Sequence, residues 1–329
     1  EKDSSGTDED VNAEEEDAAP AAEAQALIDN EMNDLYGARS GTYGLRARKK
    51  PDYSHMFATT KDEDSPLVTA QMNMRQGLKA FGEEGVKAVR SEMQQLHDRN
   101  VMKAKASTDL TPEQKRQALG YLMFLKRKRS GKVKGRGCAD GRKQRAFVDR
   151  ADAASPTVAT EAVFLTAVID AKENRDVAVV DVPGAFMQAD MDELVHIRFT
   201  GKMVEILLEI DRDMYGPCIT KERNETVMYV ELLKALYGTL RAARLFWEKL
   251  TGKLKEWGFV VNEYDPCVAN KMVDDKQLTV VWHVDDLKVS HVSSEVVDDF
   301  IRQMEDEFGK EAPLSVSRGK ILEYLGMIL

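Results

Sequence analysis

Three aspartates at the ends of short apolar segments are the residues best suited to chemistry. Asp181 follows the apolar run 177–180, and Asp285-Asp286 lies between the apolar segments 278–284 and 287–292. An ionised carboxylate in such surroundings is unfavourable unless a cation compensates it. Carboxylate oxygens suit Mg²⁺, which bridges carboxylates to substrate phosphates, and two such ions can stabilise both oxygens of a phosphoryl displacement. We therefore predict that Asp181, Asp285 and Asp286 are metal ligands for phosphoryl or nucleotidyl transfer.

Other Asp-Asp pairs in the chain show that the dipeptide alone has little specificity. Asp274-Asp275 is followed by Lys276-Gln277 and is predicted to be a solvated hairpin loop, and the pair at 298–299 lies on the surface of a predicted helix. The pair at 285–286 differs because apolar segments flank it on both sides and because Asp181 supplies a third carboxylate.

The formal net charge of −10 is unevenly distributed. Residues 1–25 carry −9, residues 101–150 carry +11 and residues 151–329 carry −12. When one face of a molecule binds a polyanion, the local charge of that face matters more than the net charge of the whole chain. We predict that a basic hairpin tip or mobile arm at 126–136 contacts nucleic-acid phosphates, through Lys126, Arg127, Lys128, Arg129, Lys132 and Lys134. The alternative is a solvated face or a nuclear-import run.

The elements that must position these side chains follow from the apolar periodicity and the turn signals. Residues 1–66 are predicted to be a disordered acidic head and basic linker, and 67–329 a folded domain. Helices are predicted over 69–97 with a break at Gly82 to Gly85, from Thr111-Pro112 to about 125, and over 158–172, 231–257 and 295–308. A strand is predicted over 177–182 and a three-stranded meander over 267–292, with turns at 274–275 and 285–286. This order predicts an α+β fold in which an antiparallel sheet packs on helices.

Composition excludes two classes of protein. Three cysteines do not form a disulfide framework or a zinc site, which favours a reducing, intracellular environment, and no apolar run is long enough for a membrane span.

Several motifs, in one order, resemble those of the copia-type retrotransposon reverse transcriptases. Residues 180–186 (VDVPGAF), 234–238 (KALYG) and 283–286 (HVDD) resemble the DVKTAF, KALYGL and YVDD motifs. Residues 134–141 resemble the KARLVAKG motif, Ser155-Pro156 the FSPV step, 265–267 the DPC motif and 324–326 the YLG motif. The departures, which include His283 in place of Tyr, remove no carboxylate. The resemblance covers about residues 70–329.

The resemblance implies a right-hand polymerase fold with fingers and palm, without a ribonuclease H segment. It implies that Asp181, Asp285 and Asp286 are catalytic ligands of two Mg²⁺ ions, with Mn²⁺ as an alternative. Phe186 would be the aromatic gate against a ribose 2′-hydroxyl, although an ordinary core aromatic is equally compatible with its position. Arg136 would face the incoming triphosphate, and Tyr237 and Gly238 would form the floor of the nucleotide site.

The implied activity is RNA-directed DNA polymerisation, in which a primer 3′-hydroxyl attacks the α-phosphate of a dNTP. The implied partners are an RNA or DNA template with its primer, dNTPs, and the integrase and ribonuclease H products of the same polyprotein. Virus-like particles in the cytoplasm are the implied location, with a nuclear phase also allowed. A catalytically decayed or domesticated nucleic-acid-binding remnant is the alternative. A metal-dependent nuclease or integrase is disfavoured, since its carboxylates are not expected as an Asp-Asp turn within a hairpin.

Overall fold

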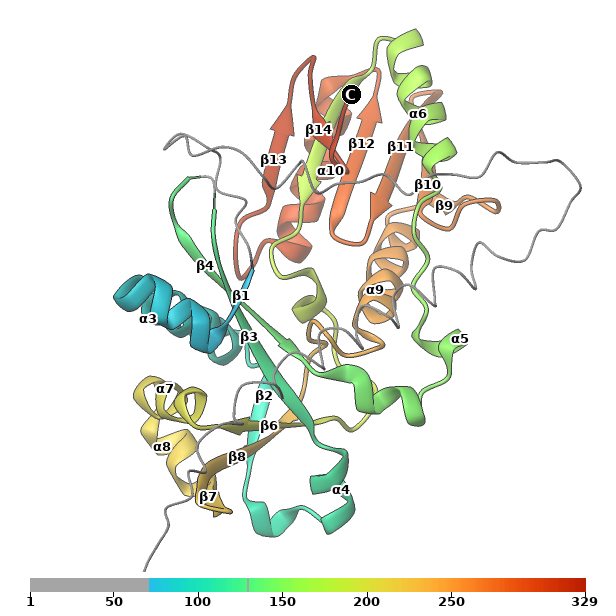
Figure 1. Cartoon of the computed structure of the whole chain (residues 1–329). Helices are drawn as coiled ribbons and strands as arrows, with labels where there is room; N and C mark the ends of the chain where they lie inside the picture. The colour runs from blue at the N-terminus through green and yellow to red at the C-terminus, as the bar shows by residue number, and fades with distance from the viewer. Residues whose placement is uncertain (1–70, 129) are drawn as a thin grey trace, which may run out of the picture. The chain divides into compact units, whose positions relative to one another are not determined.

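The computed structural model describes residues 71–128 and 130–329, which contain two large β-sheets, a two-stranded hairpin and the helices that pack on the sheets (Figure 1). The predicted acidic head and linker at 1–66, and Arg129, lie outside the described residues. The mixture of helices with largely antiparallel sheets confirms the predicted α+β class.

The first sheet has seven strands and is built mainly from the amino-terminal half of the described chain. Its path is β1 (Met72–Asn73), β3 (Leu119–Arg127), β6 (His196–Thr200), β8 (Glu225–Leu232) and β2 (Met102–Lys105), with β4 (Val133–Ala139) on β3 and β7 (Ile219–Glu222) on β8. The β3–β6 pair is parallel and the other pairs are antiparallel.

Helices α3 (Met74–Asp98) and α7 (Lys202–Ile210) bury apolar side chains against this sheet, and the short α8 (Arg212–Tyr215) follows α7. Val89, Met93 and Leu96 of α3 are almost fully buried. The φ angle of Gly82 is +52°, a conformation that breaks the helix and that glycine adopts readily. The predicted interruption of this helix is therefore confirmed.

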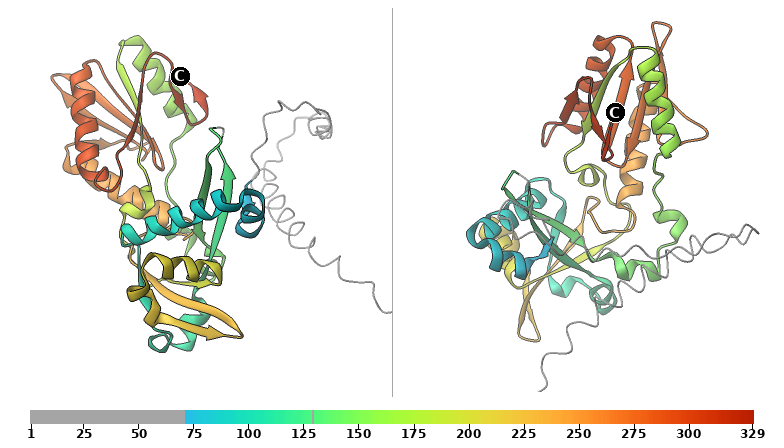
Figure 2. Two further views of the ribbon diagram at one scale, coloured as in Figure 1. Left: turned by 90° about the vertical axis from the view of Figure 1, so that its left-hand side faces the viewer. Right: turned by 45° about the horizontal axis from the view of Figure 1, so that its top comes forward.

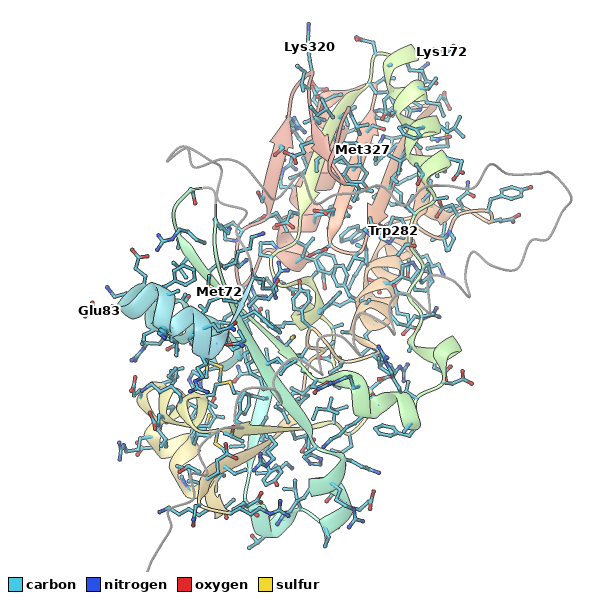
Figure 3. The ribbon with its side chains drawn as sticks, viewed as in Figure 1. Met72, Glu83, Lys172, Trp282, Lys320 and Met327 are labelled. Atoms are coloured by element: carbon cyan, nitrogen blue, oxygen red, sulfur yellow. The ribbon has the colours of Figure 1, made fainter. Side chains whose placement is uncertain are left out.

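The second sheet is entirely antiparallel and has six strands. Their order is β13 (Ser315–Arg318), β5 (Asp176–Asp181), β12 (Asp286–His291), β11 (Lys276–His283), β10 (Val268–Val273) and β9 (Val260–Val261). One face packs on α9 (Ala242–Glu256) and α10 (Ser294–Phe308), around the buried Trp282 (Figures 2 and 3). The other face packs on α6 (Thr160–Lys172) and on the hairpin of β14 (Glu323–Tyr324) and β15 (Met327–Ile328).

Because side chains alternate along a strand, each strand of this sheet has two different faces. Ala178 and Val180 of β5 join the core beneath α9 and α10, whereas Val179 packs with the α6 side. On β12, Leu287 and Val289 face the α9 and α10 core. Asp181 and Asp286 therefore project on the same face as α6.

Two predicted helices are corrected by the structure. The helix that begins at Thr111 has the expected capping box, but α4 (Pro112–Gln117) ends after six residues. The chain then forms β3, whose residues alternate between buried and exposed or half-buried positions. The predicted helix 231–257 forms only from Ala242, because the preceding residues complete β8 and then turn.

Short elements complete the connections: α5 (Arg150–Ala153) and the 3₁₀ helices η1 (Ser107–Asp109), η2 (Gly141–Ala146), η3 (Ala185–Gln188) and η4 (Gly216–Cys218). Among the helices of the described residues, none combines the length and the apolar character that a membrane span requires.

Candidate active site

The paired strands β5 and β12 bring the three predicted carboxylates to one end of the six-stranded sheet. Asp181 is the last residue of β5 and is the register partner of Asp286, the first residue of β12. The Val182 amide donates a hydrogen bond of 3.2 Å to the Asp285 carbonyl oxygen, which fastens the two strand ends together. Residues from distant parts of the sequence thus meet at one end of the sheet, where the strands β5 and β12 end and begin; we call this end, with Asp181, Asp285 and Asp286, the carboxylate edge.

The turn that carries Asp285 is tight and strained. His283 pairs with Asp286, so the loop between β11 and β12 consists of Val284 and Asp285 alone. This corrects the predicted turn by one residue, because Asp286 belongs to the strand. Val284 has a φ of +60°, a conformation that is a clear outlier for a β-branched residue. Such strain persists only where the surrounding structure fixes it, and it occurs frequently at functional sites.

The electrostatics of this edge are those of a site with excess negative charge. Burial, followed by the neighbouring Asp285, raises the pKa of Asp181, and Lys134 partly opposes the rise. Burial also raises the pKa of Asp286, with Asp285 and Asp181 adding to the rise and His283 opposing it. Both shifts mean that the ionised carboxylates are unfavourable until a cation neutralises them.

The donor chemistry at this edge fits a divalent metal, since three hard carboxylate oxygens lie at adjoining strand ends and destabilise one another. Across residues 71–128 and 130–329, however, no three His, Cys, Asp or Glu side chains are arranged as a group that could hold a metal ion. The fit therefore rests on the backbone positions and charges of these aspartates.

Tyr237 connects the loop after β8 to the carboxylates. Its hydroxyl donates to Asp285 Oδ2 at 3.4 Å, and its ring lies 4.3 Å from that of Phe186, centroid to centroid. Burial and the Asp285 carboxylate raise the pKa of the Tyr237 phenol well above its usual value, so the group remains a donor at neutral pH. Its backbone is held as well, because the Ala139 amide donates to the Tyr237 carbonyl at 2.7 Å.

Gly238 is required where this loop meets the end of β4. Its φ is +89°, and a Cβ atom there would lie 2.0 Å from the Ala139 carbonyl oxygen. The close approach holds Tyr237 between β4 and Asp285, so a larger residue at 238 would displace the phenol.

The comparison with known protein families agrees with this geometry. The sequence profile of the family described as reverse transcriptase (RNA-dependent DNA polymerase) matches residues 109–328. The chain belongs to the reverse transcriptase family. This family is found in copia-type elements. Among curated proteins, a search found no match to the chain.

Phe186 in this reverse transcriptase domain occupies the 3₁₀ helix η3, directly after the turn that follows Asp181. The side chain is half-buried: it packs against the core beneath α9 and α10, and it also contacts Tyr237. It is therefore both a core aromatic and a neighbour of the carboxylate edge, which is compatible with either predicted role.

The cations of β4 approach the same edge. Lys134 and Arg136 are exposed and alternate on one face of the strand. Lys134 lowers the pKa of Asp181, and Arg136 lowers that of Tyr237, so both charges act at the site. The structure thus brings Lys134 into the electrostatic range of Asp181, and Arg136 into that of Tyr237 beside the carboxylates.

The rest of the basic segment forms the predicted hairpin tip between β3 and β4. Lys126, Lys128 and Lys132 are exposed, whereas Arg127 is occupied by an ion pair with Glu84 and by stacking over Phe81. A groove of about 650 Å³ runs between α3 and this hairpin; among its lining residues are Lys87, Lys128, Lys132, Lys134, Glu84 and Glu92. Its cationic walls are suited to a phosphate backbone.

Sequence reasoning missed three residues that organise the domain around this edge. Arg99 is a buried guanidinium that contacts the loop after Asp181. Gln144, also buried, accepts a hydrogen bond from the Leu240 amide, and Glu92 accepts one from the Gly137 amide. None belongs to a recognisable motif, so only the fold reveals them.

Proposed function

We propose that the chain is the RNA-directed DNA polymerase of a copia-type element, which transfers a nucleotidyl group from a dNTP to a primer 3′-hydroxyl. The observation that carries the proposal is the pairing of Asp181 with Asp286 beside the Asp285 turn, within a chain of the reverse transcriptase family. On this proposal the six-stranded sheet is the palm, and the seven-stranded sheet with α3 forms the fingers.

The reaction is an in-line displacement at the α-phosphate. The primer 3′-oxygen forms the new phosphorus–oxygen bond, the bond to the bridging oxygen of the β-phosphate breaks, pyrophosphate leaves, and the hydroxyl proton passes to water. Asp181, Asp285 and Asp286 would hold two Mg²⁺ or Mn²⁺ ions, which supply neutralisation of the phosphate charge and activation of the hydroxyl. The raised pKa values of Asp181 and Asp286 favour occupancy, because a cation removes the repulsion from the neighbouring acids.

The surrounding residues position the substrates. Tyr237 orients Asp285 through its hydroxyl and contributes the floor of the nucleotide site together with Gly238. Phe186 stacks beside that floor, where a bulky ring can exclude a 2′-hydroxyl. Arg136, exposed on β4, would bind the triphosphate, and the lysines of the basic hairpin would follow the phosphates of the template and primer.

The experiment is primer extension on an RNA template by the full chain with dNTPs and Mg²⁺. Asp285→Asn preserves volume while it removes one charge, so extension should disappear with little change in the melting temperature. Asp274→Asn, in the exposed β10–β11 turn, is the matched control and should extend like the wild type.

If the wild type binds primer–template but does not extend the primer, the polymerase proposal is wrong and the alternative, a nucleic-acid-binding remnant, is supported. Cleavage of the strand in place of extension would indicate a metal-dependent nuclease. Assembly into cytoplasmic virus-like particles with integrase and ribonuclease H is the setting that a copia-type origin implies.

A further inference from the structure

Arg99 caps the carboxyl end of α3, the helix that packs on the seven-stranded sheet, and its side chain reaches the loop that follows Asp181. Its side chain is 5% exposed. One guanidinium nitrogen, Nη1, donates to the Pro183 carbonyl at 3.1 Å and lies 3.5 Å from the Gly184 carbonyl. Those carbonyls belong to the turn between Asp181 on β5 and Phe186 on η3. A single side chain thus contacts the connection between a predicted ligand and the predicted gate.

The turn itself is shaped to admit the guanidinium. Gly184 has a φ of +66°, and a Cβ atom built on it would lie 2.3 Å from Arg99 Nη1. The Gly184 carbonyl also accepts the Met187 amide at 2.9 Å, which begins η3. Glycine is therefore needed here both for the left-handed conformation and for the close approach of Arg99.

An ion pair extends the contact to the other side of Asp181. Arg99 Nε lies 3.1 Å from Glu311 Oε2, in the segment that leads into β13. β13 pairs with β5, and its Ser315 is the register partner of Asp181. The strand that flanks Asp181 on the side away from β12 is thus linked to the same guanidinium.

Glu311 continues the chain of charges to the Tyr237 loop. Its Oε1 lies 3.0 Å from Lys234 Nζ, three residues before Tyr237. The backbone follows the same route, since the Val101 carbonyl, two residues after Arg99, accepts from the Leu233 and Lys234 amides at 2.8 and 3.2 Å. The end of α3 therefore contacts three segments that approach the carboxylates: the turn after Asp181, the segment that leads into β13, and the loop that carries Tyr237.

We propose that Arg99 is a positioning residue: it holds the Asp181–Phe186 connection in place relative to Tyr237, so that the fingers helix sets the geometry of the nucleotide site. This inference rests on the proposed polymerase function for its catalytic consequence. Its structural part, restraint of the 182–188 turn, is independent of the reaction.

The contact demands arginine in particular. The planar guanidinium presents donors in fixed directions, so Nη1 and Nε can serve a carbonyl and a carboxylate together. A lysine ammonium preserves the charge but is a compact centre that cannot reproduce both directions. Arg99→Lys therefore removes the directed donors of the guanidinium while it keeps the positive charge.

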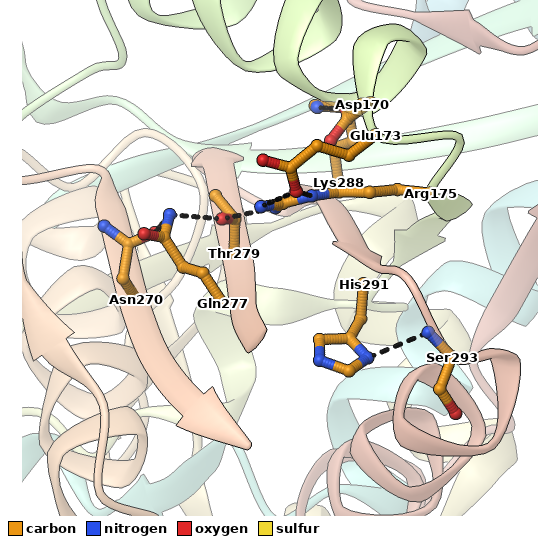
Figure 4. A network of polar contacts seen from close by, with 9 residues as sticks. All are labelled: Asp170, Glu173, Arg175, Asn270, Gln277, Thr279, Lys288, His291 and Ser293. Atoms are coloured by element: carbon orange, nitrogen blue, oxygen red, sulfur yellow. Dashed lines mark hydrogen bonds and ion pairs between the residues drawn. The ribbon is translucent and has the colours of Figure 1, made fainter. Parts of the chain in front are cut away.

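Arg175 provides a matched control, because its side chain is 3% exposed, pairs with Glu173 at 2.8 Å and donates to Thr279 Oγ1 at 3.0 Å (Figure 4). It is an arginine with an equally buried side chain whose partners are Glu173 and Thr279 in place of the 182–188 turn and Tyr237. Arg175→Lys and Arg99→Lys should both lower the melting temperature.

The first measurement is hydrogen exchange of the full chain in the peptide that covers 182–189. The Met187 and Ala189 amides bond to Gly184 and Phe186 carbonyls within this turn. Arg99→Lys should accelerate their exchange, and Arg175→Lys should leave it at the wild-type rate. Glu311→Gln, which removes the ion pair but keeps arginine, should have a smaller effect in the same direction and serves if Arg99→Lys fails to fold.

The second measurement is the ratio of dNTP to rNTP incorporation, together with kcat and KM, at a temperature where all variants are folded. Arg99→Lys should lower kcat by about 10-fold or more, because loss of a hydrogen bond that supports a metal-binding group typically has an effect of this size. The variant should also lower the ratio of dNTP to rNTP incorporation. Arg175→Lys should change neither.

Unchanged exchange at 182–189 in Arg99→Lys would overturn the inference, as would altered exchange with unchanged kcat and discrimination in an active enzyme. Accelerated exchange in a chain whose wild type extends no primer would overturn the polymerase proposal and the catalytic part of the inference while supporting the structural restraint.

Discussion

Two charged clusters lie on the same face of the strand pair β5 and β12. Near the carboxyl end of α6, Lys288 of β12 forms an ion pair with Asp170, and both side chains are buried (Figure 4). Two residues before Lys288 on β12, Asp286 lies opposite Asp181 with Asp285 beside it, and the pKa values of Asp181 and Asp286 are raised by burial and by acidic neighbours. The first cluster pairs opposite charges directly, whereas the second gathers like charges that Lys134 and His283 oppose only in part.

The difference separates a structural use of aspartate from a functional one. A buried pair can be replaced by apolar residues with little loss, but removing one partner leaves an uncompensated charge. Acidic groups that repel one another have no structural advantage, so their presence indicates a binding partner that arrives from solution. The predictions below test this division, from the largest expected effect to the smallest.

Asp181→Asn and Asp170→Asn make the sharpest contrast, because each change removes one charge and keeps the volume. Asp181→Asn should reduce primer extension by at least about 10³-fold, since stabilisation of transition-state charge by metal is worth several kcal/mol. Asp170→Asn should retain extension at low temperature and lower the melting temperature. If Asp170→Asn abolished extension without destabilising the chain, the division between the ion pair and the three carboxylates would be wrong.

Lys288→Met tests the buried ion pair with Asp170 directly. The variant leaves Asp170 as a buried, unpaired carboxylate, so the free energy of unfolding should fall by about 3–5 kcal/mol in chemical denaturation. Burial lowers the pKa of Lys288, and the Asp170 carboxylate opposes that change.

The double variant Lys288→Met with Asp170→Leu should recover most of that loss, because no charge remains to be buried. A double variant as unstable as Lys288→Met alone would mean that packing beneath α6, and not charge, determines the stability around Lys288 and Asp170.

Phe186→Val probes the contact between the core and the carboxylate edge. If the ring excludes a 2′-hydroxyl, ribonucleotide incorporation should rise by about 10- to 100-fold relative to deoxynucleotide, the range that one pocket wall can supply. The competing core role predicts a cavity that costs up to about 3 kcal/mol and equal losses for both sugars. Competition between rNTP and dNTP, run beside a thermal melt, decides between the two.

The smallest effect concerns stability without metal. The raised pKa of Asp286 means that its protonated form is favoured in the folded state, so its unfavourable contribution appears as pH rises through that pKa. In a chelator at pH 7, Asp286→Asn should therefore melt a few degrees above the wild type. The difference in melting temperature should disappear below about pH 4, near the ordinary aspartate pKa, because Asp286 is then protonated in both the folded and the unfolded state.

Asp274→Asn, in the exposed β10–β11 turn, should show no such pH-dependent gain. If the melting temperature of Asp286→Asn stayed above that of the wild type at low pH, the stabilisation would come from packing and not from relief of charge repulsion.

Local signals predicted the carboxylate edge better than they predicted its surroundings. The strand ending at Asp181 and the meander around 285–286 were predicted because short apolar runs with sharp turns are typical of buried strands. The position of the turn was wrong by one residue, since Val284 adopts a left-handed conformation that a β-branched residue rarely takes.

The errors arose where a strong local signal competed with tertiary pairing. The capping box at Thr111 begins a true helix, but this helix has only six residues, because Leu119 and Tyr121 already belong to a strand of the seven-stranded sheet. Arg99 and Gln144 could not be predicted, because their partners are backbone groups and carboxylates of distant segments, and contacts of this kind leave no spacing pattern in the sequence.

The position of β5 in its sheet also has a consequence for biosynthesis. β5 is made before β6 to β11, yet both of its neighbours, β12 and β13, come from the last part of the chain. Pairings of such long sequence separation form slowly, after the cost of closing the intervening loop. During translation the carboxylates therefore remain apart until β12 has left the ribosome, and β5 remains an unpaired edge until then. A chain released early would contain the strand that carries Asp181 without either neighbour, and it would be expected to aggregate.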